Sequence, residues 1–119
     1  MTQAGVINTA GKSAATLTGT SGDDSFKGSA GNDAFYGLGG NDIFDLRAGG
    51  VDRVDLADIY SAGLTEVKII GRKADDTLFA PDGSEIELDT RTYNKAGIQV
   101  GALVLRWDNA VVSLTFSTS

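Results

Sequence analysis

The amino-acid sequence predicts an all-β protein in which a short stack of parallel β coils is followed by a small antiparallel β-domain. Two observations carry this prediction. Residues 19–45 repeat a nine-residue pattern of glycine, aspartate and phenylalanine, which is typical of stacked coils. Residues 66–119 hold short apolar or alternating segments separated by turn-forming residues, which is typical of β-strands.

The repeat consists of three consecutive units, GTSGDDSFK, GSAGNDAFY and GLGGNDIFD, which agree at four positions. The first position holds Gly19, Gly28 and Gly37, and the fourth holds Gly22, Gly31 and Gly40. The sixth holds Asp24, Asp33 and Asp42, and the eighth holds Phe26, Phe35 and Phe44. Three units in register at four positions indicate a repeat architecture rather than isolated turns.

Each unit combines a glycine-rich turn with a strand that is too short to stand alone. Two units make one flattened coil with a strand on each side and a loop at each end. The next coil stacks on it at strand spacing, about 4.8 Å. Every ninth residue then faces the interior, which predicts one apolar ladder of Leu17, Phe26, Phe35, Phe44 and Val54.

Stacking brings loops that are two repeats apart to the same side of the coils. Asp24 is therefore expected next to Asp42. Asp33 is expected next to Asp52, in a fourth, imperfect unit at Gly50–Asp55 that has slipped by one residue near positions 46–48. Adjacent carboxylates repel unless a cation lies between them, and Ca²⁺ prefers 6–8 oxygen ligands. We predict about two calcium sites, with the Asp33/Asp52 site weakened by the slip.

Loop residues around these carboxylates complete the predicted calcium sites. Glycine lets a backbone carbonyl approach an ion without a Cβ in the way, and asparagine and aspartate side chains add further oxygens. The additional candidate ligands are Gly22, Gly31, Gly39, Gly40, Gly50, Asp23, Asn32 and Asn41.

Outside the repeats, the chain divides into two further segments. Residues 1–18 are predicted to be a leader that ends in a degenerate first turn at Leu17, and residues 56–119 a β cap on the last coil. Within the cap, a short helical turn is expected at 56–65. Antiparallel strands are expected at 66–71, 76–80, 84–89, 98–107 and 111–116.

Composition excludes several functions. The net charge of −6 argues against nucleic acid and anionic membrane as partners. The chain has no cysteine and no histidine, so it lacks disulfides, thiolate metal ligands and the commonest general base. No nucleophile–base pair can be named, and we expect no enzymatic activity.

The sequence also shows neither a membrane span nor an N-terminal secretory signal. No apolar run reaches the roughly 18 residues of a membrane span, and residues 1–10 lack the basic start and apolar core of a secretory signal. The expectation is a cytosolic protein or one exported by a route that does not read the N-terminus.

The repeats resemble the RTX calcium-binding nonapeptide G-G-x-G-x-D-x-U-x over Gly19–Asp55. The second glycine of that motif is replaced by Thr20, Ser29 and Leu38. The resemblance implies a parallel β-roll, calcium-dependent folding, and secretion by type I machinery through an uncleaved C-terminal signal, hence an extracellular location. Residues 51–56 are similar to the segment that follows the repeats in serralysin-type proteases and in mannuronan C5-epimerase modules.

Three functions remain open at this point. The leading interpretation is a calcium-binding module that folds outside the cell and supports secretion. The first alternative binds an acidic polysaccharide such as alginate beside an adjacent catalytic domain. Its candidate contacts are Arg72, Lys73, Arg91 and Arg106 on one face. The second alternative is a fragment of a surface layer or an adhesin.

Overall fold

A computed structural model of the chain describes residues 7–9, 16–20, 22–37, 41–56, 63–80, 83–86, 93–107 and 110–118. These residues form ten β-strands and no helix, which confirms the all-β fold class. Accordingly, no helix in the described ranges could cross a membrane. The strands are β1 (Ile7–Thr9), β2 (Thr16–Thr18), β3 (Ser25–Lys27), β4 (Ala34–Tyr36), β5 (Ile43–Asp45), β6 (Arg53–Asp55), β7 (Gly63–Ile70), β8 (Thr77–Phe79), β9 (Gly101–Trp107) and β10 (Ala110–Ser117).

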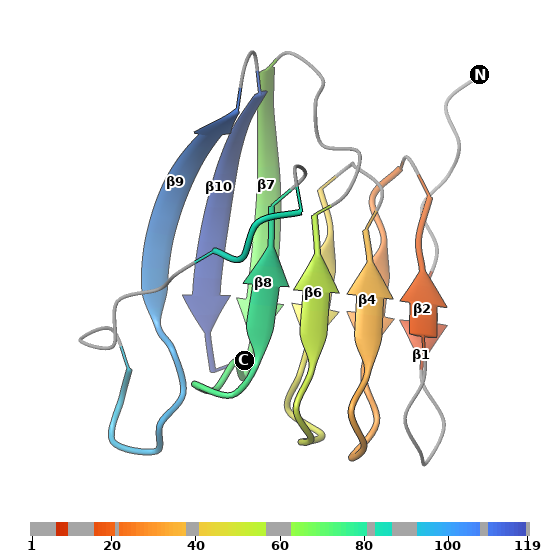
Figure 1. Cartoon of the computed structure of the whole chain (residues 1–119), viewed down its shortest axis with the longest axis vertical. Coiled ribbons are helices and arrows are strands. Elements are labelled where there is room, and N and C mark those ends of the chain that lie inside the picture. Colours follow the sequence, from red (N-terminus) through yellow and green to blue (C-terminus); the bar gives the residue numbers. More distant parts are fainter. Residues whose placement is uncertain are drawn as a thin grey trace.

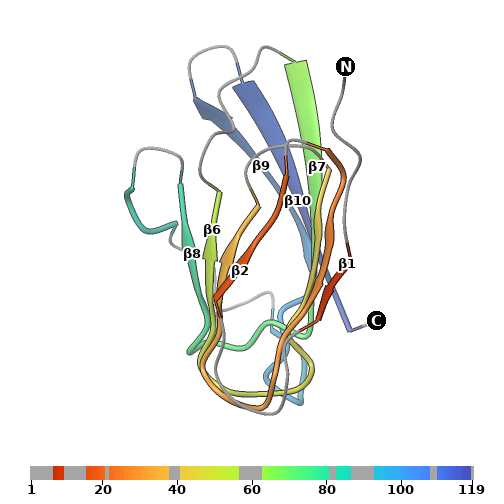
Figure 2. The ribbon, with the colours of Figure 1, turned by 90° about the vertical axis from the view of Figure 1, so that its right-hand side faces the viewer.

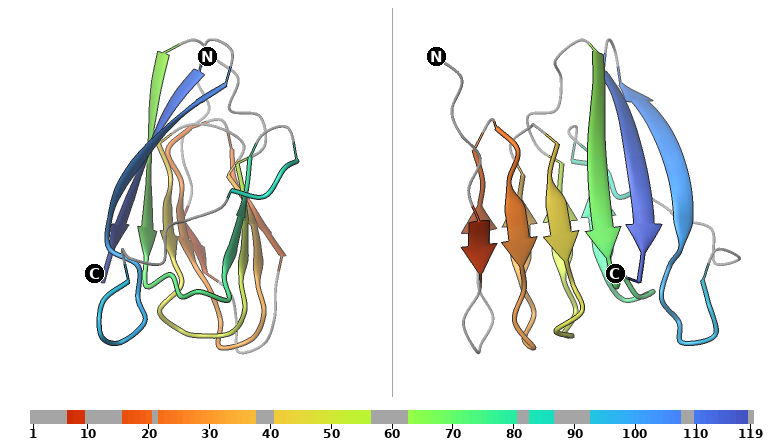
Figure 3. Two further views of the ribbon diagram at one scale, coloured as in Figure 1. Left: turned by 60° about the vertical axis from the view of Figure 1, so that its left-hand side comes forward. Right: turned by 180° about the vertical axis from the view of Figure 1, so that it is seen from behind.

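The strands form two sheets that face each other (Figures 1 and 2). The six-stranded sheet has the order β1-β3-β5-β7-β10-β9, and the right-hand view of Figure 3 shows its strands side by side. The four-stranded sheet has the order β2-β4-β6-β8. From β1 to β8 the chain alternates between the sheets, so each consecutive pair of strands is one coil of a parallel roll.

Eighth-position side chains fill the space between the sheets in two columns. One column follows the register Phe26–Phe44–Ile69 in the six-stranded sheet. The other follows Leu17–Phe35–Val54–Leu78 in the four-stranded sheet. Except for Leu17, which is partly buried, these residues are at most 1% exposed. The predicted interior position of these residues is therefore confirmed, but they form two columns on facing sheets rather than one ladder.

The three phenylalanine rings hold the first coils together. The rings of Phe26 and Phe44 stack with centroids 4.8 Å apart and an interplanar angle of 5°. Phe35, from the opposite sheet, meets both rings edge-on, with centroids 6.0 and 5.9 Å away. Offset-stacked and edge-to-face pairs contribute about 0.5–1.5 kcal/mol each beyond the burial of their area.

The slip in the fourth unit is absorbed by a turn. The N–H of Gly49 donates to the Leu46 carbonyl, and Gly49 and Gly50 have φ values of 109° and 80°. Glycine adopts this left-handed region without the steric cost of a Cβ. The extra residue therefore stays in the loop, and Val54 pairs with Phe35 in the regular register.

The strand pairing of the C-terminal half differs from the antiparallel arrangement predicted for it. β7 pairs in parallel with β5, and β8 in parallel with β6, so residues 66–71 and 76–80 extend the roll. β10 is also parallel to β7, and only its pairing with β9 is antiparallel among the described strands. The parallel pairing places Ile69 and Leu78 in the two columns of the core.

Two shorter predictions have mixed outcomes. Residues 84–86 do run antiparallel to β8, because Phe79 bridges Glu85 and the Ile86 N–H donates to the Leu78 carbonyl. Most of the expected helical turn at 56–65 lies outside the described residues, and residues 63–65 belong to β7.

Candidate metal centre

Every sixth-position aspartate lies immediately before a strand of the roll. Asp24 and Asp42 precede β3 and β5 in the six-stranded sheet, and we call them the A ladder. Asp33 and Asp52 precede β4 and β6 in the four-stranded sheet, where Asp76 precedes β8, and these three form the B ladder. All five side chains are at most 3% exposed. The roll therefore buries five carboxyl groups along its two loop edges.

Each ladder is joined by hydrogen bonds from coil to coil. The main-chain N–H of Asp24 donates to Asp42 Oδ1 at 2.8 Å. In the B ladder, the N–H of Asp33 donates to Asp52 Oδ1 at 2.9 Å, and the N–H of Asp52 donates to Asp76 Oδ1 at 2.7 Å. Both pairs predicted from the repeat period are thus brought together. Their distances are alike, although the second pair was expected to be the weaker one.

Asp76 was not predicted as a ligand, although its unit keeps part of the repeat pattern. Gly71, Asp76 and Leu78 occupy the first, sixth and eighth positions of a fifth nonapeptide. The unit lacks the fourth-position glycine, where it has Ala74, and it begins well after the fourth unit ends. Its register with β6 completes the B ladder and creates a third carboxylate pair, Asp52/Asp76.

Burial makes three of these carboxylates costly to ionise. Desolvation raises the pKa of Asp42 to about 8, although the hydrogen bond from the Asp24 N–H lowers it, and the charge of Asp24 adds to the rise. Desolvation likewise raises the pKa of Asp52 to about 7, with contributions from Asp76 and Asp33. The pKa of Asp76 is raised by the same cause. A bound cation stabilises the ionised form of such groups, because an opposite charge within a few Å favours it.

The second-position hydroxyls bind the carboxylate of their own unit. The Thr20 N–H and Oγ1 donate to Asp24 Oδ2 and Oδ1 at 2.8 and 2.9 Å. The Ser29 N–H and Oγ donate to Asp33 Oδ2 and Oδ1 at 2.7 and 2.9 Å. Replacement of the motif's second glycine therefore adds a donor to these two loops.

Asp52 lacks an equivalent donor. In the loop that leads into the fourth unit, the Arg47 N–H donates instead to Asp45 Oδ1 at 3.0 Å. The Oδ2 atom of Asp52 is buried and has no hydrogen-bond partner within the described part of the chain. A buried carboxylate oxygen without a donor is costly, and it is the kind of atom that a calcium ion binds.

The first-position glycines leave the space that the carboxylates occupy. A Cβ on Gly19 would lie 2.5 Å from Asp24 Oδ2, one on Gly28 2.8 Å from Asp33 Oδ2, and one on Gly37 2.6 Å from Asp42 Oδ2. None of these three glycines has a positive φ. Glycine is therefore required here by the close approach of the carboxylate.

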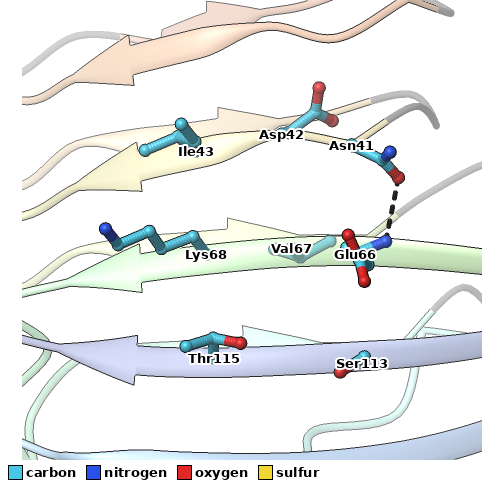
Figure 4. A pocket seen from close by; sticks show the side chains of 8 residues that line it. All are labelled: Asn41, Asp42, Ile43, Glu66, Val67, Lys68, Ser113 and Thr115. Atoms are coloured by element: carbon cyan, nitrogen blue, oxygen red, sulfur yellow. Dashed lines mark hydrogen bonds between the residues drawn. The ribbon is translucent and has the colours of Figure 1, made fainter.

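The fifth-position side chains form a separate, exposed series. Asp23 Oδ1 accepts from the Asn41 N–H at 2.9 Å, and Asn32 Oδ1 accepts from the Val51 N–H at 2.7 Å. Figure 4, a view of a groove of about 400 Å³ on the six-stranded sheet, shows the third contact. There Asn41 reaches the Glu66 N–H, whereas Asp42 points towards the preceding coil. These predicted ligands therefore join each coil to the next.

The fourth-position glycines lie in the loops that flank the ladders. The N–H groups of Gly22 and Gly31 donate to Thr20 Oγ1 and Ser29 Oγ at 3.1 and 3.0 Å. A Cβ on Gly50 would lie 2.0 Å from the Gly31 carbonyl oxygen. Gly39 and Gly40 lie outside the described residues. Where the chain is described, no three acidic side chains converge on one point, so a cation bound at a ladder pair would also need carbonyl or water ligands.

The predicted basic face for polysaccharide binding is wrong in one of its four residues, Arg72. This side chain is only 5% exposed and hydrogen-bonded within the protein, so it does not lie on an open surface. Lys73 and Arg106 are exposed, and Arg91 lies outside the described residues.

Comparison with known proteins agrees with this geometry. None of the curated proteins compared with the chain matches it. A family model described as the RTX calcium-binding nonapeptide repeat matches residues 11–54 in four copies. The matched segment contains both carboxylate pairs predicted from the period, and it ends before the unit of Asp76. Residues 11–54 of this chain therefore belong to the RTX calcium-binding nonapeptide repeat family.

Proposed function

We propose that this calcium-binding RTX module is a folding switch, in which calcium ions bridge the aspartates of successive coils. The pairs are Asp24/Asp42, Asp33/Asp52 and Asp52/Asp76. The observation that carries the proposal is the burial of these carboxyl groups in direct coil-to-coil contact. Each ion would take carboxylate oxygens from both members of a pair and complete 6–8 ligands from loop carbonyls and water.

The physical basis of the switch is the cost of burying the carboxylates without a counter-charge. At low calcium, folding requires that buried groups such as Asp42 and Asp52 either remain charged or take up protons. At high calcium, the ion binds the folded roll and not the unfolded chain, so it stabilises the fold by mass action. The binding free energy thereby becomes folding free energy.

Such a switch suits a protein that is secreted unfolded. RTX repeats are typical of secreted bacterial proteins, and free calcium is scarce inside cells. The chain would stay loose enough in the cytosol to pass through type I machinery, and it would fold outside. The lack of cysteine and histidine is consistent with a module that relies on oxygen ligands.

Circular dichroism during a calcium titration, reversed with EGTA, tests the proposal. We expect calcium to increase the β signal and the melting temperature, and magnesium to have a much smaller effect. The matched control replaces all five ladder aspartates with asparagine, which preserves size and removes the charges. A spectrum and melting temperature that do not respond to calcium in the unaltered protein would refute the proposal.

A further inference from the structure

The B ladder ends at Asp76, because β8 is the last of the described strands in the four-stranded sheet. Within the ladder, each aspartate carbonyl accepts an N–H from the next coil: Asp33 O accepts from the Arg53 N–H at 2.8 Å, and Asp52 O from the Thr77 N–H at 2.9 Å. Each aspartate N–H except the last donates to the carboxylate of the next coil. A terminal coil would leave both groups of Asp76 unpaired and buried, which is costly.

The turn before β8 supplies both missing partners. Arg72 Nη2 donates to the Asp76 carbonyl, in place of the next coil's N–H. The Asp76 N–H donates to the Lys73 carbonyl at 3.0 Å, in place of the next carboxylate. The Lys73 N–H also donates to Asp76 Oδ2 at 2.9 Å. The fifth unit therefore closes its own end of the ladder with one side chain and one turn.

Arg72 is held in this place by a distant segment of the chain. Its Nη1 atom donates to Tyr93 Oη at 2.7 Å and to Gln99 Oε1 at 2.8 Å. The Gln99 N–H donates to the Arg72 carbonyl at 2.8 Å, and both Arg72 and Gln99 are at most 5% exposed. The guanidinium is thus fixed by contacts from three directions, as a planar group with several donors allows.

Arg72 carries a buried positive charge at the end of the ladder. Within the described part of the chain, its hydrogen bonds go to a phenol oxygen, an amide oxygen and a main-chain carbonyl, and its Nε atom has no acceptor. The contact of Nη2 with the Asp76 carbonyl places this buried cation beside the last aspartate of the ladder.

We propose that Arg72 is the end cap of the B ladder and the positioning residue for a calcium site at Asp52/Asp76. This inference rests on the proposed calcium-binding function and goes beyond it. It assigns a role to the second-position residue of the fifth unit, which lies outside the matched segment. Arg72 stands as a fixed cation where the ladder would otherwise continue, and it links the last site to the segment that carries Tyr93 and Gln99.

Calorimetric titration with calcium chloride tests the assignment in four variants. Arg72→Met removes the charge and the donors at similar length, whereas Arg72→Lys keeps the charge. Tyr93→Phe removes one acceptor of Nη1 with little change in volume. Arg106→Met removes an exposed cation of β9, outside the ladders, and is the matched control. Circular dichroism at saturating calcium monitors the fold of each variant.

We expect the unaltered protein and Arg106→Met to bind three calcium ions. Arg72→Met should bind two with unchanged affinity and the third roughly 10–100-fold more weakly, as is typical when a group that orients a ligand is removed. Arg72→Lys should recover part of the loss, and Tyr93→Phe should weaken only the same site. Selective loss separates a positioning role from general destabilisation, which would weaken all sites together.

Two results would overturn the inference, and they are distinguishable. If the unaltered protein binds no calcium, the proposed function falls and the role of Arg72 falls with it. If the unaltered protein binds calcium, and both Arg72→Met and Tyr93→Phe bind the same number of ions equally tightly, the proposed function survives and the inference alone is wrong. Should Arg72→Met fail to fold, Arg72→Lys and Tyr93→Phe decide the outcome in the same way.

Discussion

The Oδ1 atom of Asp42 accepts a hydrogen bond of 2.8 Å from the main-chain N–H of Asp24, eighteen residues earlier in the chain. This contact joins two coils through a buried carboxylate rather than through strand pairing alone. The same relationship recurs between Asp33 and Asp52 and between Asp52 and Asp76. In the proposed switch, calcium binding and coil stacking use the same side chains, and changes to those side chains should affect both.

Asp52 should matter more than Asp42 for calcium stoichiometry. Asp52 belongs to two pairs of the B ladder, whereas Asp42 belongs to one pair of the A ladder. We expect Asp52→Asn to lose two calcium ions and Asp42→Asn to lose one, as counted by equilibrium dialysis. Asparagine keeps an Oδ1 acceptor, so the coil-to-coil hydrogen bond survives in both variants. Equal losses would contradict the assignment of Asp76 to the ladder.

Gly28→Ala should destabilise the roll in the presence of calcium. The new Cβ would lie 2.8 Å from Asp33 Oδ2 and 3.0 Å from the Cζ atom of Phe35. Overpacking of this kind costs about 1–3 kcal/mol, which urea denaturation would measure. Ala30→Gly, in the same loop at an exposed position, is the control and should cost less than Gly28→Ala. A fully stable Gly28→Ala variant would show that Asp33 does not approach Gly28 as closely as described.

Much of the roll could be predicted because the period of nine maps directly onto space. The positions of Phe26, Phe35 and Phe44, and the pairing of Asp24 with Asp42, follow from the repeat and the stacking of two units per coil. The parallel pairing of β7 and β8 could not be predicted in the same way. Period-two alternation identifies a strand but does not distinguish a parallel neighbour from an antiparallel one.

Asp76 and Arg72 escaped prediction for different reasons. Asp76 lies in a degenerate unit that is separated from the others by β7, so a fixed period does not reach it. Arg72 depends on contacts with Tyr93 and Gln99, which are long-range and leave no local pattern. Its sequence neighbourhood resembles an exposed basic pair, and only its burial reveals a structural role.

Stability in calcium-depleted buffer should fall as the pH rises. The pKa of Asp42 is raised from 3.8 to about 8 in the folded state, so the folded protein binds more protons than the unfolded chain between these values. Stability then decreases with pH across that window, and no histidine titrates within it. Urea midpoints should be lower at pH 8.5 than at pH 5.5. Asp42→Asn should reduce the difference, and a midpoint that rises with pH would contradict the raised pKa.

Phe35→Ala should unfold the roll more readily than any substitution on its outer face. Phe35 is fully buried and contacts the rings of Phe26 and Phe44. Truncation of a buried phenylalanine costs about 3–5 kcal/mol. Ile43→Ala, at a side chain that is 40% exposed, is the control and should change the unfolding free energy by about 0.5 kcal/mol or less. Similar urea midpoints for the two variants would contradict the position of the core.

A crystal structure grown in calcium chloride tests the central claim most directly. We predict calcium ions between Asp24 and Asp42, between Asp33 and Asp52, and between Asp52 and Asp76, with carboxylate oxygens at about 2.3–2.6 Å. At least one of the two ions at Asp52 should contact its Oδ2 atom, which lacks a hydrogen-bond donor. Calcium found only at the exposed fifth-position side chains, or absent from all three pairs, would contradict a roll whose coils are bridged by buried carboxylates.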